Sequence, residues 1–240
     1  MAKQSGCNLV LLPGLHGTGE LFGDFVRTLP ADILPYVISY PTQEVLTLSG
    51  HAEFVFNRLP GSFVMLAESF SGLIALSLLS EYQVPAQAVI FCAAFGRPPR
   101  RVLLSVLRSF PRLGLVLRLA PGRVIGALCA GNQNNARVVT VLRRALSRVG
   151  EDVIANRFRL LAEEHVFKSE FRVPCYYFQA KHDRLVPSRH VQWFQERFPD
   201  FTVERIDGPH FLLQTRAEEC AKRVANITRH LRHVGDTGPA

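Results

Sequence analysis

Residues 63–76 read FVMLAESFSGLIAL, an apolar run of strand length followed by a helix-like apolar pattern. Between the two lies Ser69, with the small residues Ala67 and Ser71 two positions to either side. Small neighbours allow the chain to turn sharply there, because a long side chain would collide with the turn. Gly72 follows and permits a close approach of the helix. The pattern predicts a strand, a sharp turn and a helix, with the Ser69 hydroxyl at the tip.

A serine at such a turn has two interpretations. It is a nucleophile in the motif G-x-S-x-G, whose glycine places are held here by Ala67 and Ser71. It is an ordinary capping residue in many other strand-to-helix turns. The motif alone does not decide between them, so the choice depends on whether the rest of the chain supplies the groups that activate a serine.

The composition indicates a globular protein. The chain has 240 residues with 48% hydrophobic content, for which a large core and a single domain are the default. No apolar run reaches the roughly 18 residues of a membrane span, and the first six residues lack the apolar core of a signal peptide. The five cysteines are scattered and form no CxxC pair, which favours reduced packing residues over bridges or metal ligands. These features predict a cytoplasmic protein without a bound metal.

Short apolar strands and helical segments alternate along the chain. Strands that are apolar on both faces indicate a mostly parallel central sheet with helices on both faces, an α/β architecture. Besides the strand that begins at Phe63, the predicted strands are 7–12, 36–40, 88–94, 173–180 and 201–206. The predicted helices are 20–29, 46–59, the one after Gly72, 188–197 and 215–233, with Ser188 and Thr215 as the expected caps of the last two.

The alternation stops in residues 96–172, which contain no strand-like run. This stretch is predicted to be an inserted helical cap, and 1–95 together with 173–240 to be the core. Its expected helices are 100–109, 112–119, 122–130, 134–149 and 151–165. The many leucines of the cap are most simply explained by packing against the core, and the alternative is a substrate-facing or lipid-facing slot between cap and core.

The net charge of +8 is concentrated in the same part of the chain. From Tyr82 through Gly150 there is no Asp or Glu, while arginine recurs throughout. A basic surface attracts acidic partners, so an acidic carrier protein is one expected partner of the cap. However, 24 of the 28 basic residues are arginine, so a compositional bias of the source explains the excess equally well. Nucleic-acid binding is not predicted, because charge would be its only support.

Three polar residues follow apolar strands directly: Ser69, Asp183 and His210. The carboxyl ends of parallel strands meet at one edge of a sheet, so the three side chains are expected to converge. A serine hydroxyl needs a neutral imidazole to take its proton and a carboxylate to orient that imidazole. Singly, Asp183 could be a turn residue or could pair with Arg184, and His210 could be structural. Their coincidence at strand ends favours a catalytic triad, with His210 as the base and Asp183 as its orienting acid.

The loop after the first strand reads Gly14-Leu15-His16-Gly17-Thr18-Gly19 and lacks the Gly-Lys-Ser/Thr of a Walker A motif. Its glycines let backbone N–H groups approach a reacting atom closely. We therefore expect an oxyanion hole formed by the backbone N–H groups of Leu15 and Phe70. His16 and Gly14 are candidates for lining the pocket.

Two further residues near these motifs have expected roles that are not catalytic. Glu68 precedes Ser69 and is expected to be a buried hydrogen-bond partner. His182, the second candidate for the base, adjoins Asp183 in the chain and is expected to point elsewhere.

From about Asn8 to Leu231 the chain resembles the α/β-hydrolase superfamily, in its branch of small single-domain serine esterases, which includes the pimeloyl-acyl-carrier-protein methyl ester esterases. The resemblance rests on residues 11–19, 67–72, 182–187 and 208–211. The chain departs from the family pattern in having no glycine at positions 67 and 71, and in the apparent lack of the first antiparallel strands. A serine rather than an aspartate at position 69 argues against the dehalogenase and epoxide-hydrolase branches.

The resemblance implies an α/β-hydrolase fold and a carboxylic ester hydrolase that needs no cofactor. Together with the residues above, it predicts a serine hydrolase that cleaves an ester or thioester of a hydrophobic acyl group through an acyl-enzyme intermediate. The small-molecule acyl substrate would be free or linked to an acidic carrier. The alternative is a non-catalytic member of the same fold that holds a ligand in its pocket.

Overall fold

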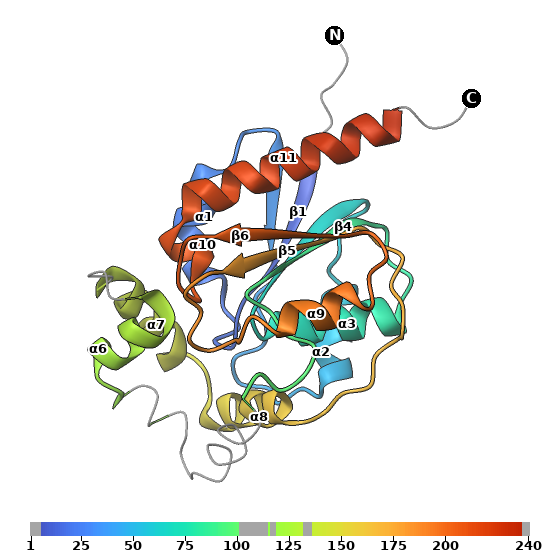
Figure 1. Cartoon of the computed structure of the whole chain (residues 1–240). Helices are drawn as coiled ribbons and strands as arrows, with labels where there is room; N and C mark the ends of the chain where they lie inside the picture. The colour runs from blue at the N-terminus through green and yellow to red at the C-terminus, as the bar shows by residue number, and fades with distance from the viewer. Residues whose placement is uncertain (1–5, 101–114, 116–118, 132–135, 237–240) are drawn as a thin grey trace.

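The protein is seen here in a computed structural model that describes residues 6–100, 115, 119–131 and 136–236 (Figure 1). Within them, six strands form one sheet in the order β2-β1-β3-β4-β5-β6, and each neighbouring pair is parallel. The predicted parallel sheet is therefore confirmed. The strands are β1 Cys7–Leu12, β2 Ile33–Val37, β3 Phe63–Glu68, β4 Ala86–Cys92, β5 Cys175–Ala180 and β6 Phe201–Ile206.

The central strands are apolar on both faces because helices cover both. In β1, Val10 and Leu12 belong to one hydrophobic layer, and Leu9 and Leu11 belong to the other. The first layer is completed by α2 Leu48–Phe56, α3 Ser71–Glu81 and α9 His190–Gln195. The second is completed by α1 Gly23–Thr28, α10 Leu212–Thr215 and α11 Ala217–Asp236. Figure 1 shows these two groups of helices on opposite sides of the sheet.

Strand β2 differs from its prediction. The expected strand at 36–40 lies instead at Ile33–Val37, where it pairs with β1 from Cys7 opposite Ile33 onward. Pro35 lies inside this strand, and a proline is tolerated there because β2 is at the edge of the sheet, where one side of the strand needs no partner.

Two predicted helix caps are wrong. Helix α9 begins at His190 after Arg189, which makes no side-chain capping bond, so Ser188 does not cap it. Thr215 is the last residue of α10, and its hydroxyl donates to the Phe211 carbonyl four residues back. Elsewhere, the helix predicted at 20–29 is divided into η1 Gly19–Phe22 and α1, and Thr47 caps α2 by accepting from the Gly50 N–H at 2.9 Å.

The described parts of residues 96–172 contain helices and no strand. These are α6 Gly122–Ile125, a π-helical turn η2 Gly126–Ala130, α7 Ala136–Ser147 and α8 Glu151–Ala162. Helices α6 and α7 lie beyond the carboxyl ends of β5 and β6 (Figure 1). The helices predicted at 100–109 and 112–119 fall mostly outside the described residues, and the division of the chain into core and cap stays a prediction.

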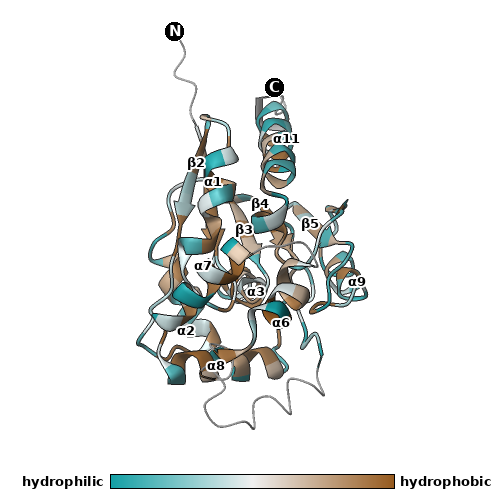
Figure 2. Ribbon diagram, turned by 90° about the vertical axis from the view of Figure 1, so that its left-hand side faces the viewer, coloured by the Kyte–Doolittle hydropathy of each residue, from teal (hydrophilic) through white to brown (hydrophobic). Residues whose placement is uncertain are grey.

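The hydropathy pattern of α11 agrees with its position on one face of the sheet. Figure 2 shows hydrophilic and hydrophobic residues mixed along α11, the helix that covers one face of the sheet. Its buried residues include Cys220, Val224 and Ile227, which recur at helical spacing. Among the helices that the structure describes, none is both long and apolar enough to cross a bilayer.

Candidate active site

Ser69 lies at the sharp turn that the sequence predicts. Strand β3 ends at Glu68 and α3 begins at Ser71, so two residues make the turn. Ser69 adopts a φ of 51°, a left-handed conformation that is uncommon for any residue other than glycine. Its N–H donates to the Cys92 carbonyl at 2.9 Å, and its carbonyl accepts from the Gly72 N–H at 2.9 Å. This backbone places the hydroxyl at the carboxyl edge of the sheet, where a nucleophile is placed in such turns.

Gly72 is required by a close approach of two segments. A Cβ at this position would lie 2.7 Å from the Cβ of Ala94 and 3.4 Å from the backbone nitrogen of Phe95. The first turn of α3 therefore packs directly on the chain that follows β4.

The three predicted side chains come together at the ends of β3, β5 and β6. The Nε2 atom of His210 lies 3.0 Å from the Oγ atom of Ser69, and its Nδ1 atom lies 2.8 Å from Oδ2 of Asp183. Because an ionised carboxylate only accepts, Nδ1 carries the proton and Nε2 is free to accept from the serine hydroxyl. The other oxygen of Asp183 accepts from the N–H groups of Leu185 and Val186, both at 2.8 Å.

The environment of His210 favours a strong base. The side chains of His210 and Asp183 are only 3% and 6% exposed. Burial of the ring lowers the pKa of His210, but the charge of Asp183 and its hydrogen bond, with a smaller contribution from Glu68, outweigh burial and raise that pKa above 6.5. The imidazolium that forms when a serine loses its proton is therefore stabilised where it forms.

The glycine-rich loop after β1 is held by three consecutive carbonyl groups, each with its own donor. The Pro13 carbonyl accepts from the Ser71 hydroxyl, the Gly14 carbonyl from the Gly17 N–H at 2.9 Å, and the Leu15 carbonyl from Nη1 of Arg157 at 3.0 Å. Three successive peptide planes are thereby fixed.

This arrangement leaves the two expected oxyanion donors available. In a trans peptide the N–H points opposite to the C=O, so the Leu15 N–H is directed away from the turn that the Gly14 carbonyl closes. In the described part of the chain, neither the Leu15 N–H nor the Phe70 N–H donates to a protein acceptor. Both amides are thus compatible with a role in an oxyanion hole.

Ser71 has a role that the sequence did not indicate. Its Oγ atom lies 2.5 Å from the Tyr40 hydroxyl, and because the Ser71 proton goes to the Pro13 carbonyl, Tyr40 must be the donor to Ser71. Burial raises the pKa of Tyr40, so the phenol keeps its proton. A serine in place of the usual glycine therefore joins the Ser69 turn to the glycine-rich loop.

Two buried titratable side chains, His16 in the glycine-rich loop and Glu68 at the end of β3, lie close to Gly14. His16 accepts from the Thr18 N–H at its Nδ1 atom, and burial together with the charge of Arg157 lowers its pKa to about 3, so the ring is neutral. Glu68 accepts from Gln214 at 2.9 Å, and burial raises its pKa, so the expected buried hydrogen-bond partner is confirmed. A Cβ at Gly14 would be 3.7 Å from both His16 and Glu68. The lining of the substrate pocket by Gly14 and His16 stays a prediction.

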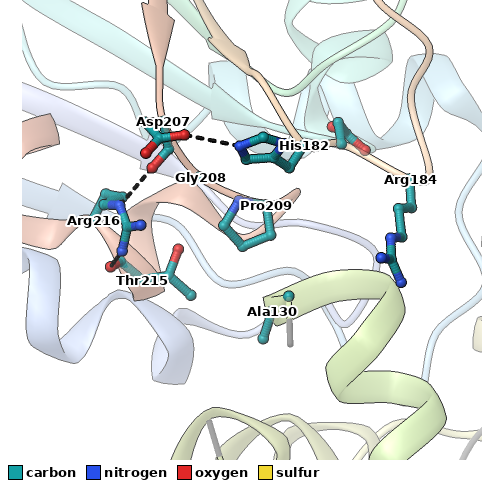
Figure 3. Close-up of a pocket in the computed structure, with 10 residues that line it drawn as sticks. Ala130, His182, Arg184, Asp207, Gly208, Pro209, Thr215 and Arg216 are labelled. Atoms are coloured by element: carbon teal, nitrogen blue, oxygen red, sulfur yellow. Dashed lines mark hydrogen bonds and ion pairs between the residues drawn. The ribbon is translucent and has the colours of Figure 1, made fainter. Parts of the chain in front are cut away.

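His182 points away from the serine, as expected. Its Nε2 atom pairs with Asp207 at 2.9 Å, and its side chain is 70% exposed. Both residues line a polar pocket of about 550 Å³ that also includes Asp183, Arg184 and Arg216 (Figure 3). The described lining of that pocket contains neither Ser69 nor His210.

Among the described residues, no group of three or more His, Cys, Asp or Glu side chains is placed to hold a metal ion. The five cysteines are free thiols, and Cys92, Cys175 and Cys220 are buried.

Comparisons with known proteins define the fold. No family model matches the chain, and no curated protein matches it in sequence. An esterase from Exiguobacterium antarcticum superposes with a TM-score of 0.79 at 13% identity, covering 94% of this chain and 92% of its own. A thermophilic esterase from Thermogutta terrifontis gives 0.77 at 17% identity, with 95% and 91% covered. An enol-lactonase from Burkholderia xenovorans gives 0.72 at 15% identity, with 93% and 92% covered.

The protein has the α/β-hydrolase fold, as the sequence motifs predicted. Because these structures share so few identical residues with the chain, their likeness shows the fold alone.

Proposed function

We propose that the protein is a serine hydrolase that cleaves a carboxylic ester or thioester. The observation that carries this proposal is the chain of hydrogen bonds from Ser69 through His210 to Asp183, with heavy-atom distances of 3.0 and 2.8 Å. Bonds of this length and order are those that transfer a proton from a serine hydroxyl to a base held in the correct tautomer. The esterases and the lactonase with the same fold act on ester bonds, which supports this reaction class.

In the proposed reaction, the Ser69 oxygen attacks the acyl carbonyl while His210 takes the hydroxyl proton. The oxygen of the tetrahedral intermediate accepts from the N–H groups of Leu15 and Phe70. His210 then gives its proton to the leaving alcohol or thiol, and the acyl group remains on Ser69. A water molecule attacks this acyl-enzyme with His210 again as the base, which releases the acid and restores the enzyme.

A hydrophobic acyl group is the substrate class that the segment between β4 and β5 suggests. The apolar residues Leu119, Val124 and Leu128 in this segment are 72%, 48% and 41% exposed. Apolar surface that is not buried in the protein's own core is available for an apolar ligand.

Replacement of the proposed nucleophile tests the function. We expect Ser69→Ala to lower the turnover of short p-nitrophenyl esters by at least about 10³-fold, because no hydroxyl remains to be acylated. Ser62→Ala, at an exposed serine just before β3, is the matched control and should keep full activity. Turnover that survives in Ser69→Ala would refute the assignment.

The alternative function, a non-catalytic ligand-binding protein, is separated by a fluorophosphonate probe. Only an activated serine reacts with this probe, so the hydrolase should be labelled at Ser69 and the binding protein should not. An unlabelled wild-type protein that still binds apolar esters would favour the alternative.

An acidic carrier as the acyl donor is a narrower form of the proposal. Several arginines of the segment between β4 and β5 already form ion pairs within the protein. Arg144 and Arg148 pair with Glu20, and Arg137 pairs with Asp24, all at 3.0 Å. The carrier would therefore meet arginines that donate only to carbonyl groups in the described structure. These are Arg100, which donates to the Arg184 carbonyl, and Arg143, which donates to the Ala120 carbonyl; Arg101 lies outside the described residues.

The carrier proposal is tested with the double variant Arg100→Glu with Arg143→Glu. It should reduce kcat/KM for a carrier-linked ester by more than tenfold and for a small ester by less than twofold, because only the carrier carries complementary charge. Equal losses on both substrates would count against a carrier.

A further inference from the structure

Arg157 is a buried cation beside the glycine-rich loop. It belongs to α8 and is 0% exposed. Among the fully buried side chains of the described structure, it is the largest. Its Nη1 atom donates to the Leu15 carbonyl at 3.0 Å and its Nη2 atom to the Pro41 carbonyl at 2.9 Å. Among the described residues, no carboxylate forms an ion pair with it.

A buried charge without a counter-ion is unfavourable for stability, because the protein interior solvates it less well than water does. Burial lowers the pKa of Arg157 to about 10, which still leaves the guanidinium charged at neutral pH. The fold thus keeps a full positive charge at a place where its partners are backbone carbonyls.

The loop is shaped around this guanidinium. Gly17 has a φ of 72°, and a Cβ there would lie 2.2 Å from Nη1 of Arg157, so both conformation and space require glycine. The Gly17 carbonyl also accepts from the Tyr40 N–H at 2.7 Å. The centroid of the Tyr40 ring lies 5.7 Å from the guanidinium carbon of Arg157. Arg157 is therefore packed into the loop.

The contact with Leu15 links this cation to the proposed reaction. The peptide before Leu15 is fixed because its carbonyl, on Gly14, accepts from the Gly17 N–H. The peptide after Leu15 is fixed because its carbonyl accepts from Arg157. Both dihedral angles of Leu15 are thereby restrained, and with them the direction of its N–H.

We propose that Arg157 is a positioning residue of the oxyanion hole: by holding the peptide after Leu15 it restrains the Leu15 backbone so that the Leu15 N–H faces the developing oxyanion, and it places a fixed positive charge beside the glycine-rich loop. Preorganised donors and charges of this kind stabilise the transition state more than the bound substrate. The inference rests on the proposed hydrolase function, and it makes α8 a part of the catalytic structure.

The test compares Arg157→Gln and Arg157→Lys with Arg159→Gln. Arg159 is a matched control because it lies on the same helix, is 51% exposed and pairs with Glu163 one turn away. For each protein we would measure kcat and KM with a short p-nitrophenyl ester and the affinity for a trifluoromethyl ketone. This ketone forms a tetrahedral adduct whose oxyanion needs the same donors. Melting temperatures and circular dichroism would show which variants fold.

We expect Arg157→Gln to lower kcat by about 10- to 100-fold, somewhat less than the loss of a direct oxyanion donor, and to change KM by less than about threefold. The affinity for the ketone should fall in parallel with kcat. Arg157→Lys keeps the charge but loses the two-pronged contact, so it should lie between Gln and wild type. Arg159→Gln should match the wild type.

A folded Arg157→Gln protein with kcat and ketone affinity within twofold of Arg159→Gln would overturn the inference. If Arg157→Gln does not fold, the same criterion applies to Arg157→Lys. Failure of the proposed function is recognised separately: the wild type would not turn over the ester, or Ser69→Ala would retain turnover. Wild-type turnover that depends on Ser69 but is insensitive to Arg157 refutes the positioning role alone.

Discussion

His210 shows how two opposing effects set the chemistry of a single residue. Its ring is almost completely buried, and burial alone disfavours the charged imidazolium. The Asp183 carboxylate at 2.8 Å reverses this effect and raises the pKa of His210. A base with a raised pKa takes a proton from serine more readily, but it needs a higher pH to be neutral before it acts.

A pH profile tests this balance. In the wild type, kcat/KM for a small ester should rise with pH to a plateau, with a midpoint above 6.5, because His210 is an inactive imidazolium below its pKa. Asp183→Asn removes the negative charge and leaves the burial, so its midpoint should move to lower pH. Its plateau should also fall by about 10²-fold or more, because the orienting carboxylate is lost.

The measurement is kcat/KM between about pH 5 and pH 9, with circular dichroism to verify the fold across that range. A midpoint for Asp183→Asn that is equal to or higher than that of the wild type would contradict the assignment of Asp183 as the group that raises the pKa.

At the scale of elements, the important contact joins the start of α3 to the loop after β1. Ser71 accepts from Tyr40 and donates to the Pro13 carbonyl, and all of these groups are buried. A glycine at position 71 would make the same sharp turn, but it would leave the Tyr40 hydroxyl and the Pro13 carbonyl without this partner. The departure from G-x-S-x-G therefore contributes to the structure of the site.

We predict that Ser71→Gly lowers the free energy of unfolding by about 1–3 kcal/mol, because two buried polar groups lose a partner. A double-mutant cycle with Ser71→Ala and Tyr40→Phe should give a coupling of about 1 kcal/mol, since each change removes the same hydrogen bond. Urea unfolding measures both quantities, with Ser62→Ala as the control. A coupling near zero would show that the Tyr40–Ser71 contact does not stabilise the fold.

Across the whole molecule, the positive segment between β4 and β5 contacts the core through both ion pairs and hydrophobic side chains. Glu20, in η1, pairs with Arg144 and Arg148 in and just after α7. The neighbouring Leu21 belongs to the same buried hydrophobic cluster as Leu142 and Leu146. The arginine side chains are 61% and 63% exposed, so water and salt screen their attraction to Glu20.

Glu20→Gln is therefore expected to lower the free energy of unfolding by less than about 1 kcal/mol, and the loss should shrink as salt is raised. The hydrophobic contacts remain and should keep α7 in place. Thermal unfolding at low and high salt measures the effect, with Glu170→Gln, whose partner Arg172 is close in sequence, as the control. A loss above 2 kcal/mol that does not depend on salt would mean that Glu20 holds the segment by more than surface charge.

Features that depend on near neighbours, or on the general geometry of a parallel sheet, could be predicted from the sequence. The strand, turn and helix around Ser69 could be predicted, because they depend on neighbours only a few positions apart. The convergence of Ser69, Asp183 and His210 could also be predicted, although up to 141 positions separate them, because parallel strands bring their carboxyl ends together. The bounds of the edge strand β2 were predicted wrongly, since the strand begins at Ile33 and includes Pro35. The predicted helix caps at Ser188 and Thr215 were also wrong.

The amino-acid sequence was enough to predict the parallel sheet and the three side chains at its edge, since apolar runs of strand length and the polar residues that directly follow them can be read along the chain. That Tyr40, Ser71 and Arg157 hold the glycine-rich loop is visible only in the folded protein. The Arg157 to Leu15 bond spans 142 positions and ends on a backbone carbonyl, which every residue possesses. Because the acceptor is a backbone carbonyl, no pattern of side chains in the sequence can predict this contact, and it depends on how α8 packs against the loop.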